Sequence, residues 1–399
     1  MSKKKYITSI VIYLSILYFI AIFHLYFKHS GGADSTISEW LINYSGGFTK
    51  RGIIGEIAIF FSRLLDQNLR DVIYIFQLSI IGIYYISIYL FFKNLYLERY
   101  FLLSIFSPIF LIYPVAEIEV LARKEVFIFV LFLLHALIPP LNNNLIRISK
   151  LVILPLSVLI WEPVIFYLPL WIFIDLVKFK IKNYNKNLFN EIIFYFPALL
   201  LAIIFIINPL TPEEHFKMEQ VLNKEFNEVC YMSCALLKSK SSIYQQFEAN
   251  FGKYSLEVFV RYFLIILIGF GPLFTLIYYS KLKQAKTIFS KKFNLLSIFL
   301  FLLSPVLLLF AMGYDWGRWV SISYIMSLIT YFYLYKNRFI ILDTKKLNSN
   351  KLNLLKPKYF LYIFIIYAFT WNPKTVITGD VASFPLYRII YKFIKIYLI

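Results

Sequence analysis

Charged residues are scarce in this sequence. Only 16% of its 399 residues are Asp, Glu, Lys or Arg, whereas hydrophobic residues make up 60% and aromatic residues 20%. An average soluble domain carries about 25% charged residues, and an apolar run of about 20 residues is long enough to cross a bilayer. The composition therefore excludes an ordinary soluble domain and predicts an all-α, polytopic integral membrane protein.

Acidic residues are scarcer than basic ones, 22 against 41, which gives a formal charge of +19. Such an excess can indicate nucleic-acid binding, but here the cations fall in short clusters between apolar runs and form no basic domain. Clusters of this kind follow the positive-inside rule and mark cytoplasmic loops. The charge therefore indicates a lipid bilayer as the partner, and nucleic acid is not expected.

Familiar catalytic signatures are also missing: the sequence has no Walker loop, no GxSxG, no HExxH and no ligand set for iron or haem. No cofactor is predicted, although Glu117-Ile-Glu119 resembles an acidic pair that binds a divalent metal together with phosphates. The cysteines, Cys230 and Cys234, are spaced to lie on one helix face in a segment expected outside the cytoplasm. A disulfide and two ordinary thiols are equally compatible with that spacing.

The apolar runs predict one membrane domain over residues 1–399 with about eleven spans. The first run, 6–27, is too long for a signal peptide and is expected to stay as a helix whose N-terminus is cytoplasmic. The C-terminus is then periplasmic, with an amphipathic helix over 385–399. The other spans are expected at 72–92, 100–113, 126–141, 188–207, 258–279, in runs ending near 312 and 336, and at 359–371, and Pro108 and Pro114 are expected to kink the one at 100–113.

The apolar stretch between Lys150 and Lys178 needs a different solution. Both lysines are expected on the cytoplasmic side, so the chain must cross an even number of times, yet the stretch is long enough for only one full span. A broken hairpin of two short helices satisfies both conditions. Trp161-Glu162-Pro163 is the expected break, because a proline disfavours helix at the preceding residue. Glu162 would then lie inside the protein toward its outer side.

Two long outer loops are expected, the first over 28–71 and a larger one over 208–257 with two or three short amphipathic helices. The first contains Tyr44-Ser-Gly-Gly-Phe-Thr-Lys-Arg-Gly-Ile-Ile-Gly-Glu56, followed by an interfacial helix over 53–65. Glycines allow close backbone approach and expose N–H groups, and the adjacent Lys50 and Arg51 suit a phosphate or carboxylate. This motif predicts a loop that binds an anionic, lipid-linked substrate.

Four polar motifs interrupt the apolar runs, at 46–56, 117–125, 161–163 and 314–319, and all are expected on the outer side. Charged residues at membrane depth are costly and indicate function. The candidates for binding phosphate are Arg51, Lys50, Arg123, Lys124 and Arg318. Each arginine has an alternative role, either extending to lipid headgroups or pairing with a nearby carboxylate.

The same motifs supply candidate acids. A glycosyl transfer needs a general base, and an apolar setting raises the pKa of a carboxylate. Glu162 fits a buried setting, and Asp34 and Asp315 fit a loop setting. The alternative role for Glu162 is to cap a helix, and the alternative for Asp315 is to pair with Arg318. The full set of acids is Asp34, Glu39, Glu56, Glu117, Glu119, Glu125, Glu162 and Asp315. The candidates for stacking on sugar rings are Trp161 and Trp316, although interfacial tryptophans are common without such a role.

With these residues in place, the chain resembles O-antigen polymerases of the Wzy type and glycosyltransferases of the GT-C superfamily. The likeness rests on the number of spans, the large outer loop and three motifs: 45–52, Arg123-Lys-Glu125 and Asp315-Trp-Gly-Arg318. It implies that the outer arginines hold undecaprenyl pyrophosphate. GT-C enzymes carry an acidic motif in the first outer loop, which Asp34 matches, but without an adjacent acidic partner.

The resemblance implies an inner-membrane polymerase that joins undecaprenyl-pyrophosphate-linked repeat units at the periplasmic face, in contact with other polysaccharide-assembly membrane proteins. A GT-C-like transferase that adds one sugar from a polyprenyl-phosphate donor is the alternative. A flippase for lipid-linked oligosaccharides ranks third, because the sequence shows none of the inverted repeats typical of transporters.

Overall fold

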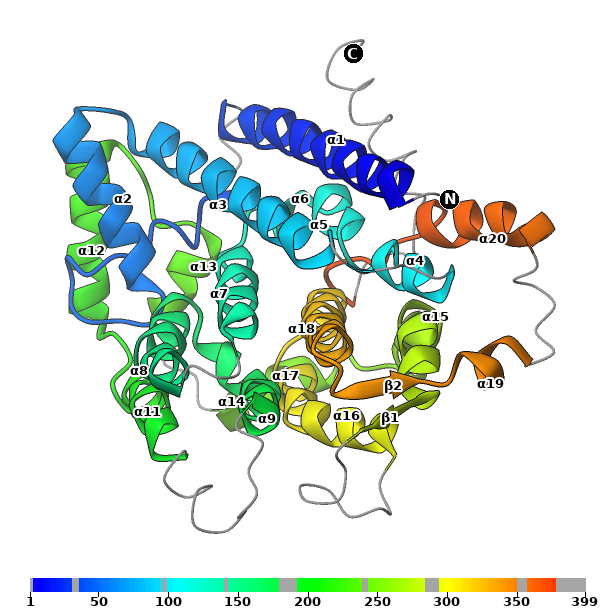
Figure 1. Ribbon diagram of the computed structural model, residues 1–399. Helices are drawn as coiled ribbons and strands as arrows, with labels where there is room; N and C mark the ends of the chain where they lie inside the picture. Colours follow the sequence, from blue (N-terminus) through cyan, green and yellow to red (C-terminus); the bar gives the residue numbers. More distant parts are fainter. Residues whose placement is uncertain are drawn as a thin grey trace. The chain divides into compact units, whose positions relative to one another are not determined.

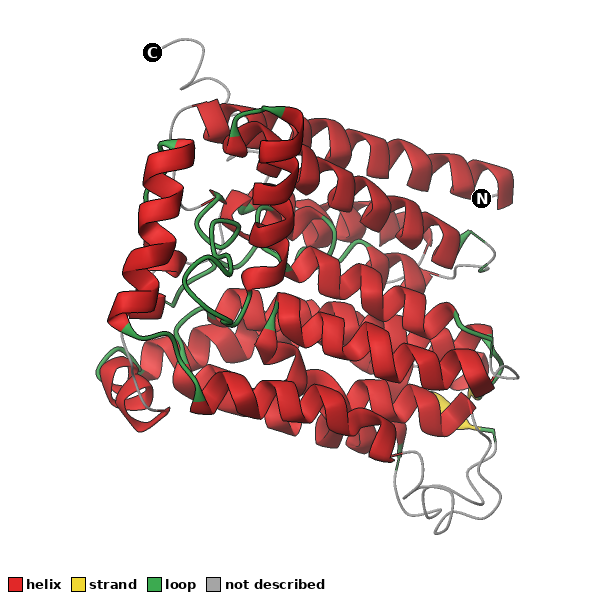
Figure 2. Ribbon diagram, turned by 90° about the vertical axis from the view of Figure 1, so that its left-hand side faces the viewer, coloured by secondary structure: helices red, strands yellow, loops and turns green. Residues whose placement is uncertain are grey.

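The computed structural model describes residues 3–30, 36–93, 95, 99–139, 143–178, 192–238, 243–283, 294–349 and 357–377. Asp34 and the expected C-terminal helix at 385–399 lie outside the described residues. Within those ranges the chain is helical almost throughout, and the strands are β1 (Ser280–Leu282) and β2 (Ile340–Leu342), which pair antiparallel (Figure 2). The prediction of an all-α protein is confirmed.

In the described part of the chain, four helical segments are long and apolar enough to cross a membrane. They lie in α1 (Lys3–Ser30), in α3 (Leu69–Phe92), in α15 (Leu256–Tyr278), and in the run Leu295–Met312, which comprises α16 (Leu295–Leu303), η5 (Ser304–Val306) and α17 (Leu307–Met312). A fifth span is counted if two neighbouring segments, Ile193–Ile207 and α12 (Pro212–Phe226), form one span, although the chain bends by 99° between them. The first of these segments ends in α11 (Phe196–Ile207). These helices fit a membrane protein, but the count of eleven spans is not confirmed.

Several expected spans are short or interrupted helices. The expected span at 100–113 is divided into α4 (Arg99–Ile105) and α5 (Ile112–Ala116), on either side of Pro108, which cannot donate a backbone hydrogen bond. Both α7 (Glu125–Leu137) and α20 (Pro357–Phe369) contain 13 residues. A helix of that length is about 20 Å long and falls short of the roughly 30 Å hydrocarbon core of a bilayer.

The chain divides into two compact units. Unit 1 comprises Met1–Lys93, Leu121–Leu168 and Asn185–Ser242, and unit 2 comprises Asn94–Val120, Pro169–Tyr184 and Ile243–Ile399. In unit 1, α3 packs against α1, against α2 (Gly52–Leu65) and against α7, and α7 packs against α8 (Asn143–Ile160) (Figure 1). An ion pair between Arg63 and Glu225 joins α2 to α12. This bundle positions the loops that precede α2 and α7.

The helix break expected at residues 161–163 is present. Helix α8 ends at Ile160, Trp161 is extended, and the 3₁₀ helix η2 (Glu162–Tyr167) begins with Glu162 and Pro163. The next helix, α9 (Leu168–Lys178), falls almost wholly in unit 2, so the hairpin itself stays a prediction.

In unit 2, α18 (Trp316–Lys336) is buried along nearly its whole length and packs against α15 and α17. Its Tyr324 hydroxyl donates to the carbonyl of Ser104 at 2.5 Å, and the Ser107 hydroxyl donates to the carbonyl of Gly269 on α15 at 3.0 Å. The described part of this unit also contains α14 (Ile243–Phe251), α19 (Thr344–Ser349) and most of α6 (Ile118–Leu121). Unit 1 contains in addition η3 (Ile193–Tyr195), α13 (Met232–Ala235) and η4 (Leu236–Lys238).

Candidate anion-binding site

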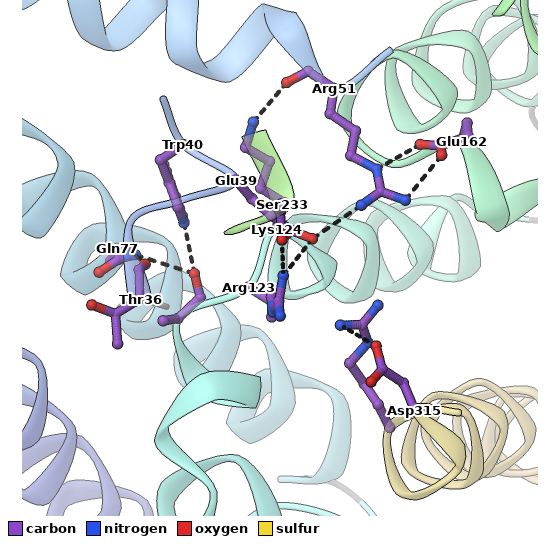
Figure 3. A network of polar contacts seen from close by, with 12 residues as sticks. Thr36, Glu39, Trp40, Arg51, Gln77, Arg123, Lys124, Glu162, Ser233 and Asp315 are labelled. Atoms are coloured by element: carbon purple, nitrogen blue, oxygen red, sulfur yellow. Dashed lines mark hydrogen bonds and ion pairs between the residues drawn. The ribbon is translucent and has the colours of Figure 1, made fainter. Parts of the chain in front are cut away.

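Five charged residues of unit 1 converge from three separate segments of the chain (Figure 3). Glu39 and Arg51 lie in the loop before α2, Arg123 and Lys124 lie just before α7, and Glu162 opens η2. We call these five residues the charge cluster. All five were candidates from the sequence, Glu39 as one of the listed acids, and the fold brings the other four together around Glu39.

Arg51 is the centre of the charge cluster. Its Nε donates to Glu162 Oε2 at 2.8 Å and its Nη2 donates to Glu162 Oε1 at 2.9 Å, which is the bidentate geometry of a strong charge-assisted pair. Its Nη1 donates to Glu39 Oε1 at 3.1 Å. Burial acts to lower the pKa of Arg51, but Glu162 and Glu39 raise that pKa overall. Arg51 is therefore charged and held in one orientation.

Arg123 shares a carboxylate with Arg51. Its Nη1 donates to Glu39 Oε1 at 2.7 Å and to Ser233 Oγ at 2.8 Å. Glu39 is only 2% exposed, so it bridges the two arginines from inside the protein. The Nε–H of Arg123 is buried and meets no acceptor among the described residues. A buried donor of this kind can be satisfied by an ordered water, an ion or an anionic ligand.

Lys124 is fully buried, and its Nζ donates to the backbone carbonyl of Arg51 at 2.6 Å. Burial lowers the pKa of Lys124 to about 7, and the carboxylate of Glu39 only partly opposes this effect. Arg51 has φ 64° and sits at the N-cap of α2, a left-handed conformation that is costly for a residue with a side chain. Lys124 stabilises this conformation through its hydrogen bond.

Glu162 does not have the raised pKa that the sequence led us to expect. Burial alone would raise the pKa of Glu162, but Arg51 and Lys50 outweigh that effect and lower it to about 2. The Lys50 ammonium lies 3.6 Å from Glu162 Oε1. Trp161, not Glu162, occupies the N-cap of η2. In this state Glu162 is an ionised partner of Arg51, and its catalytic role stays a prediction.

Exposure increases from one side of the site to the other. Glu39 and Lys124 are buried, Arg51 is 17% exposed, Glu162 is 19% exposed, and Lys50 is 40% exposed. A ligand would therefore reach Arg51 from the side of Lys50 and Glu162.

A shell of neutral side chains holds the backbone behind the cluster. The Nε2 of Gln77, on α3, donates to the carbonyls of Thr36 at 2.8 Å and Ala122 at 3.1 Å, and Trp40 Nε1 donates to Ala122 at 2.6 Å (Figure 3). Gln77 and Ser233 were not candidates from the sequence. A glutamine within an apolar span was the signal available for Gln77, whereas nothing local marked Ser233.

Glycines of the 44–56 motif allow the close backbone approach that the sequence predicts, and the approach is to neighbouring parts of the protein. A Cβ added to Gly46 would lie 1.9 Å from the carbonyl oxygen of Glu214, on α12, and one added to Gly55 would lie 2.0 Å from that of Ile42. These glycines let α12 and the preceding loop approach closely. The motif therefore uses Gly46 and Gly55 for packing, and anion binding by Arg51 stays a prediction.

Two further charged candidates, Asp315 and Arg318, belong to unit 2. Arg318 Nη1 lies 3.0 Å from Asp315 Oδ2, and the Arg318 guanidinium stacks over Trp319 at 4.5 Å. Arg318 is only 5% exposed. This is the local pair that was the alternative to a substrate role for Asp315.

The two tryptophans proposed for sugar stacking are both enclosed. Trp161 is fully buried, with its ring centroid 6.3 Å from that of Tyr167. Trp316 is surrounded by aromatic rings, including that of Tyr262, and its Nε1 donates to the carbonyl of Phe310 at 2.8 Å. Because neither ring has an open face, these placements argue against the proposed stacking role.

Two groups of residues in the described part of the chain contain potential metal ligands. Glu117 accepts a hydrogen bond from Asn372 at 3.3 Å, and in the described ranges it forms no group of three or more ligands with Glu119. His215, Cys230 and Cys234 place one ligand atom each within 4.8 Å of one another. The two cysteines form a disulfide, however, so their sulfurs are not thiolate ligands. The disulfide that the spacing left open is thus present.

Comparison of the chain with protein-family models, with curated proteins and with solved structures gave no match. Its function must therefore be inferred from the charge cluster itself.

Proposed function

We propose that this chain is a membrane-bound glycosyltransferase of the polysaccharide-polymerase type, which joins undecaprenyl-pyrophosphate-linked repeat units at the periplasmic face of the inner membrane. The observation that carries the proposal is the bidentate Arg51–Glu162 pair beside Arg123, with Lys50 on the exposed side. An arginine fork that holds a carboxylate has the geometry to hold a phosphate.

The first step is the binding of the donor pyrophosphate. Two phosphate oxygens replace the Glu162 carboxylate on the Nε and Nη2 of Arg51, while the Nε–H of Arg123 donates to another oxygen. Lys50 adds a positive charge on the exposed side. These donors are fixed before the reaction, so they stabilise the negative charge that develops on the departing pyrophosphate.

The second step uses the carboxylate that the donor displaces. Once Arg51 holds phosphate, Glu162 loses the charge that lowers its pKa and faces an anion, so its pKa rises. Glu162 then takes the proton of the acceptor hydroxyl as the oxygen attacks the anomeric carbon. The bond between that carbon and the pyrophosphate oxygen breaks, and undecaprenyl pyrophosphate leaves with the electron pair.

One observation favours the second candidate, a GT-C-like transferase. Glu39 lies in the first expected outer loop and is buried between two arginines, which is a setting for the acidic residue that this resemblance implies. In that case Glu39 would act through the two arginines that it holds, and one sugar would be added per cycle.

The function is tested by deleting the gene and separating the surface polysaccharide on a gel. Loss of the ladder with a single repeat unit retained supports the polymerase. An intact ladder with one sugar missing from each unit would instead support the GT-C-like transferase, and lipid-linked units retained in the cytoplasmic leaflet would support a flippase.

The site is tested by restoring the deletion strain with variants present in the membrane in equal amounts. Arg51→Lys keeps the charge but loses the bidentate fork, so chain lengthening should fall at least tenfold. Arg63→Lys is the matched control, because its pair with Glu225 is exposed. Glu162→Gln should bind undecaprenyl pyrophosphate at least as tightly as the wild type yet lengthen no chains. Full activity of Arg51→Lys would exclude the charge cluster as the site.

A further inference from the structure

Ser233 contacts the charge cluster from a turn that the disulfide closes. Its Oγ accepts a hydrogen bond from Arg123 Nη1 at 2.8 Å, and the same nitrogen donates to Glu39 at 2.7 Å (Figure 3). Two acceptors on one nitrogen fix the orientation of the guanidinium. The Nε–H of Arg123, which meets no acceptor in the described ranges, is thereby held in one direction.

The turn over residues 230–234, which we call the disulfide turn, is anchored on both sides. The Cys230–Cys234 disulfide joins its ends. Beneath it, Nε2 of the buried His215 lies 3.2 Å from the carbonyl oxygen of Cys234 and 3.4 Å from Cys230 Sγ. Just before the turn, Glu228 accepts a hydrogen bond from Arg70 on α3 at 2.9 Å.

The backbone inside the disulfide turn is strained. Met232 has φ 29°, in the left-handed region that residues with side chains rarely adopt. Such a conformation persists only where its surroundings impose it, and the Cys230–Cys234 disulfide spans this residue. Without the cross-link, we expect Met232 to relax toward negative φ. Ser233 is the next residue, so the relaxation moves its hydroxyl away from Arg123.

We propose that Ser233 is a positioning residue for Arg123 and that the Cys230–Cys234 disulfide keeps it in place, so that the anion site is complete only in oxidised protein. The inference rests on the proposed function for the identity of the ligand. It also implies that this part of unit 1 faces an oxidising compartment, since disulfides persist there and are rare in the cytosol.

The first experiment determines the redox state. Membranes are treated with N-ethylmaleimide before solubilisation, and the mass of the full-length protein is measured with and without prior reduction. No label without reductant and two labels after it are expected. In the reduction, dithiothreitol supplies two electrons and two protons to the disulfide, which gives two thiols and cyclic oxidised dithiothreitol. Two labels on untreated protein would overturn the proposal.

The second experiment measures amide hydrogen exchange and needs no ligand. Full-length protein in lipid nanodiscs is compared in its oxidised and reduced forms. Reduction should speed exchange in the disulfide turn and also at residues 121–125, which contain Arg123. In Ser233→Ala the effect at 121–125 should disappear, whereas Ser233→Thr, which keeps the hydroxyl, should restore it. An equal effect of reduction in Ser233→Ala would overturn the link between the turn and Arg123.

The third experiment measures the binding of undecaprenyl pyrophosphate to the same nanodiscs. Reduction of the wild type, or the double change Cys230→Ser and Cys234→Ser, should weaken binding about tenfold, as expected for losing a hydrogen bond to a charged group. Ser233→Ala should itself bind the lipid more weakly than the wild type, and reduction should weaken its binding little further. Equal binding in both redox states would overturn the inference. No binding by oxidised wild type would overturn the proposed function instead, and hydrogen exchange would still decide the role of Ser233.

Discussion

Replacement of the fully buried Lys124 by methionine should change how the stability of the protein depends on pH. Burial lowers the pKa of Lys124 from 10.5 to about 7 in the folded protein, whereas the unfolded chain keeps the ordinary value. Between these two values the unfolded state binds more protons than the folded state. The free energy of unfolding therefore rises with pH in this window, and methionine, which binds no proton, abolishes the rise.

The size of the effect follows from the two pKa values. The contribution of Lys124 to the free energy of unfolding should increase by about 2 kcal/mol between about pH 7 and pH 9. Lys124→Met also removes the donor to the carbonyl of Arg51. The loss of this hydrogen bond lowers the free energy of unfolding of the variant by about 1–3 kcal/mol at every pH. It therefore does not affect how the difference between wild type and variant changes with pH.

The measurement is urea-induced unfolding in detergent micelles, for both proteins at each pH. The free energy of unfolding of the wild type minus that of Lys124→Met should increase by about 2 kcal/mol between about pH 7 and pH 9. Lys217→Met, which removes an exposed ammonium from α12, controls for the loss of one positive charge. A difference that is the same at both pH values would refute the reasoning, because it would mean that the buried ammonium is as well stabilised as a hydrated one.

Glu162→Gln should destabilise the protein at neutral pH. The pKa of Glu162 falls from 4.5 to about 2 on folding, so its ionised carboxylate stabilises the folded state by about 3 kcal/mol above pH 4.5. This stabilisation is lost as the pH falls toward 2. Unfolding curves of the variant that keep the acid sensitivity of the wild type would contradict this. Gly55→Ala should lower the free energy of unfolding by about 1–3 kcal/mol, because the new Cβ would clash with the backbone carbonyl of Ile42. The control Gly271→Ala, with open space around its Cβ, should be neutral or stabilising in the same assay.

Much of the local structure could be predicted from the sequence. The expected spans at 72–92 and 258–279 correspond to α3 and α15, because a long apolar run with few charges is itself the physical cause of such a helix. The helix break before Glu162 was predictable for a similar reason, since Pro163 restricts its own neighbour. The number of spans could not be predicted in this way, because a short apolar run such as 100–113 does not by itself show whether it crosses a membrane, and it folds as two short helices.

The sequence alone determined which residues can carry charge chemistry. Arg51, Arg123, Lys124 and Glu162 stand out because a charged group beside apolar runs needs a partner or a ligand wherever the chain folds. Only the tertiary structure decided what these partners are. Glu39 lies far along the chain from both Arg123 and Glu162, yet its carboxylate binds two arginines at once. Such contacts depend on the packing of α2, α3 and α7, and so does the lowered pKa of Glu162.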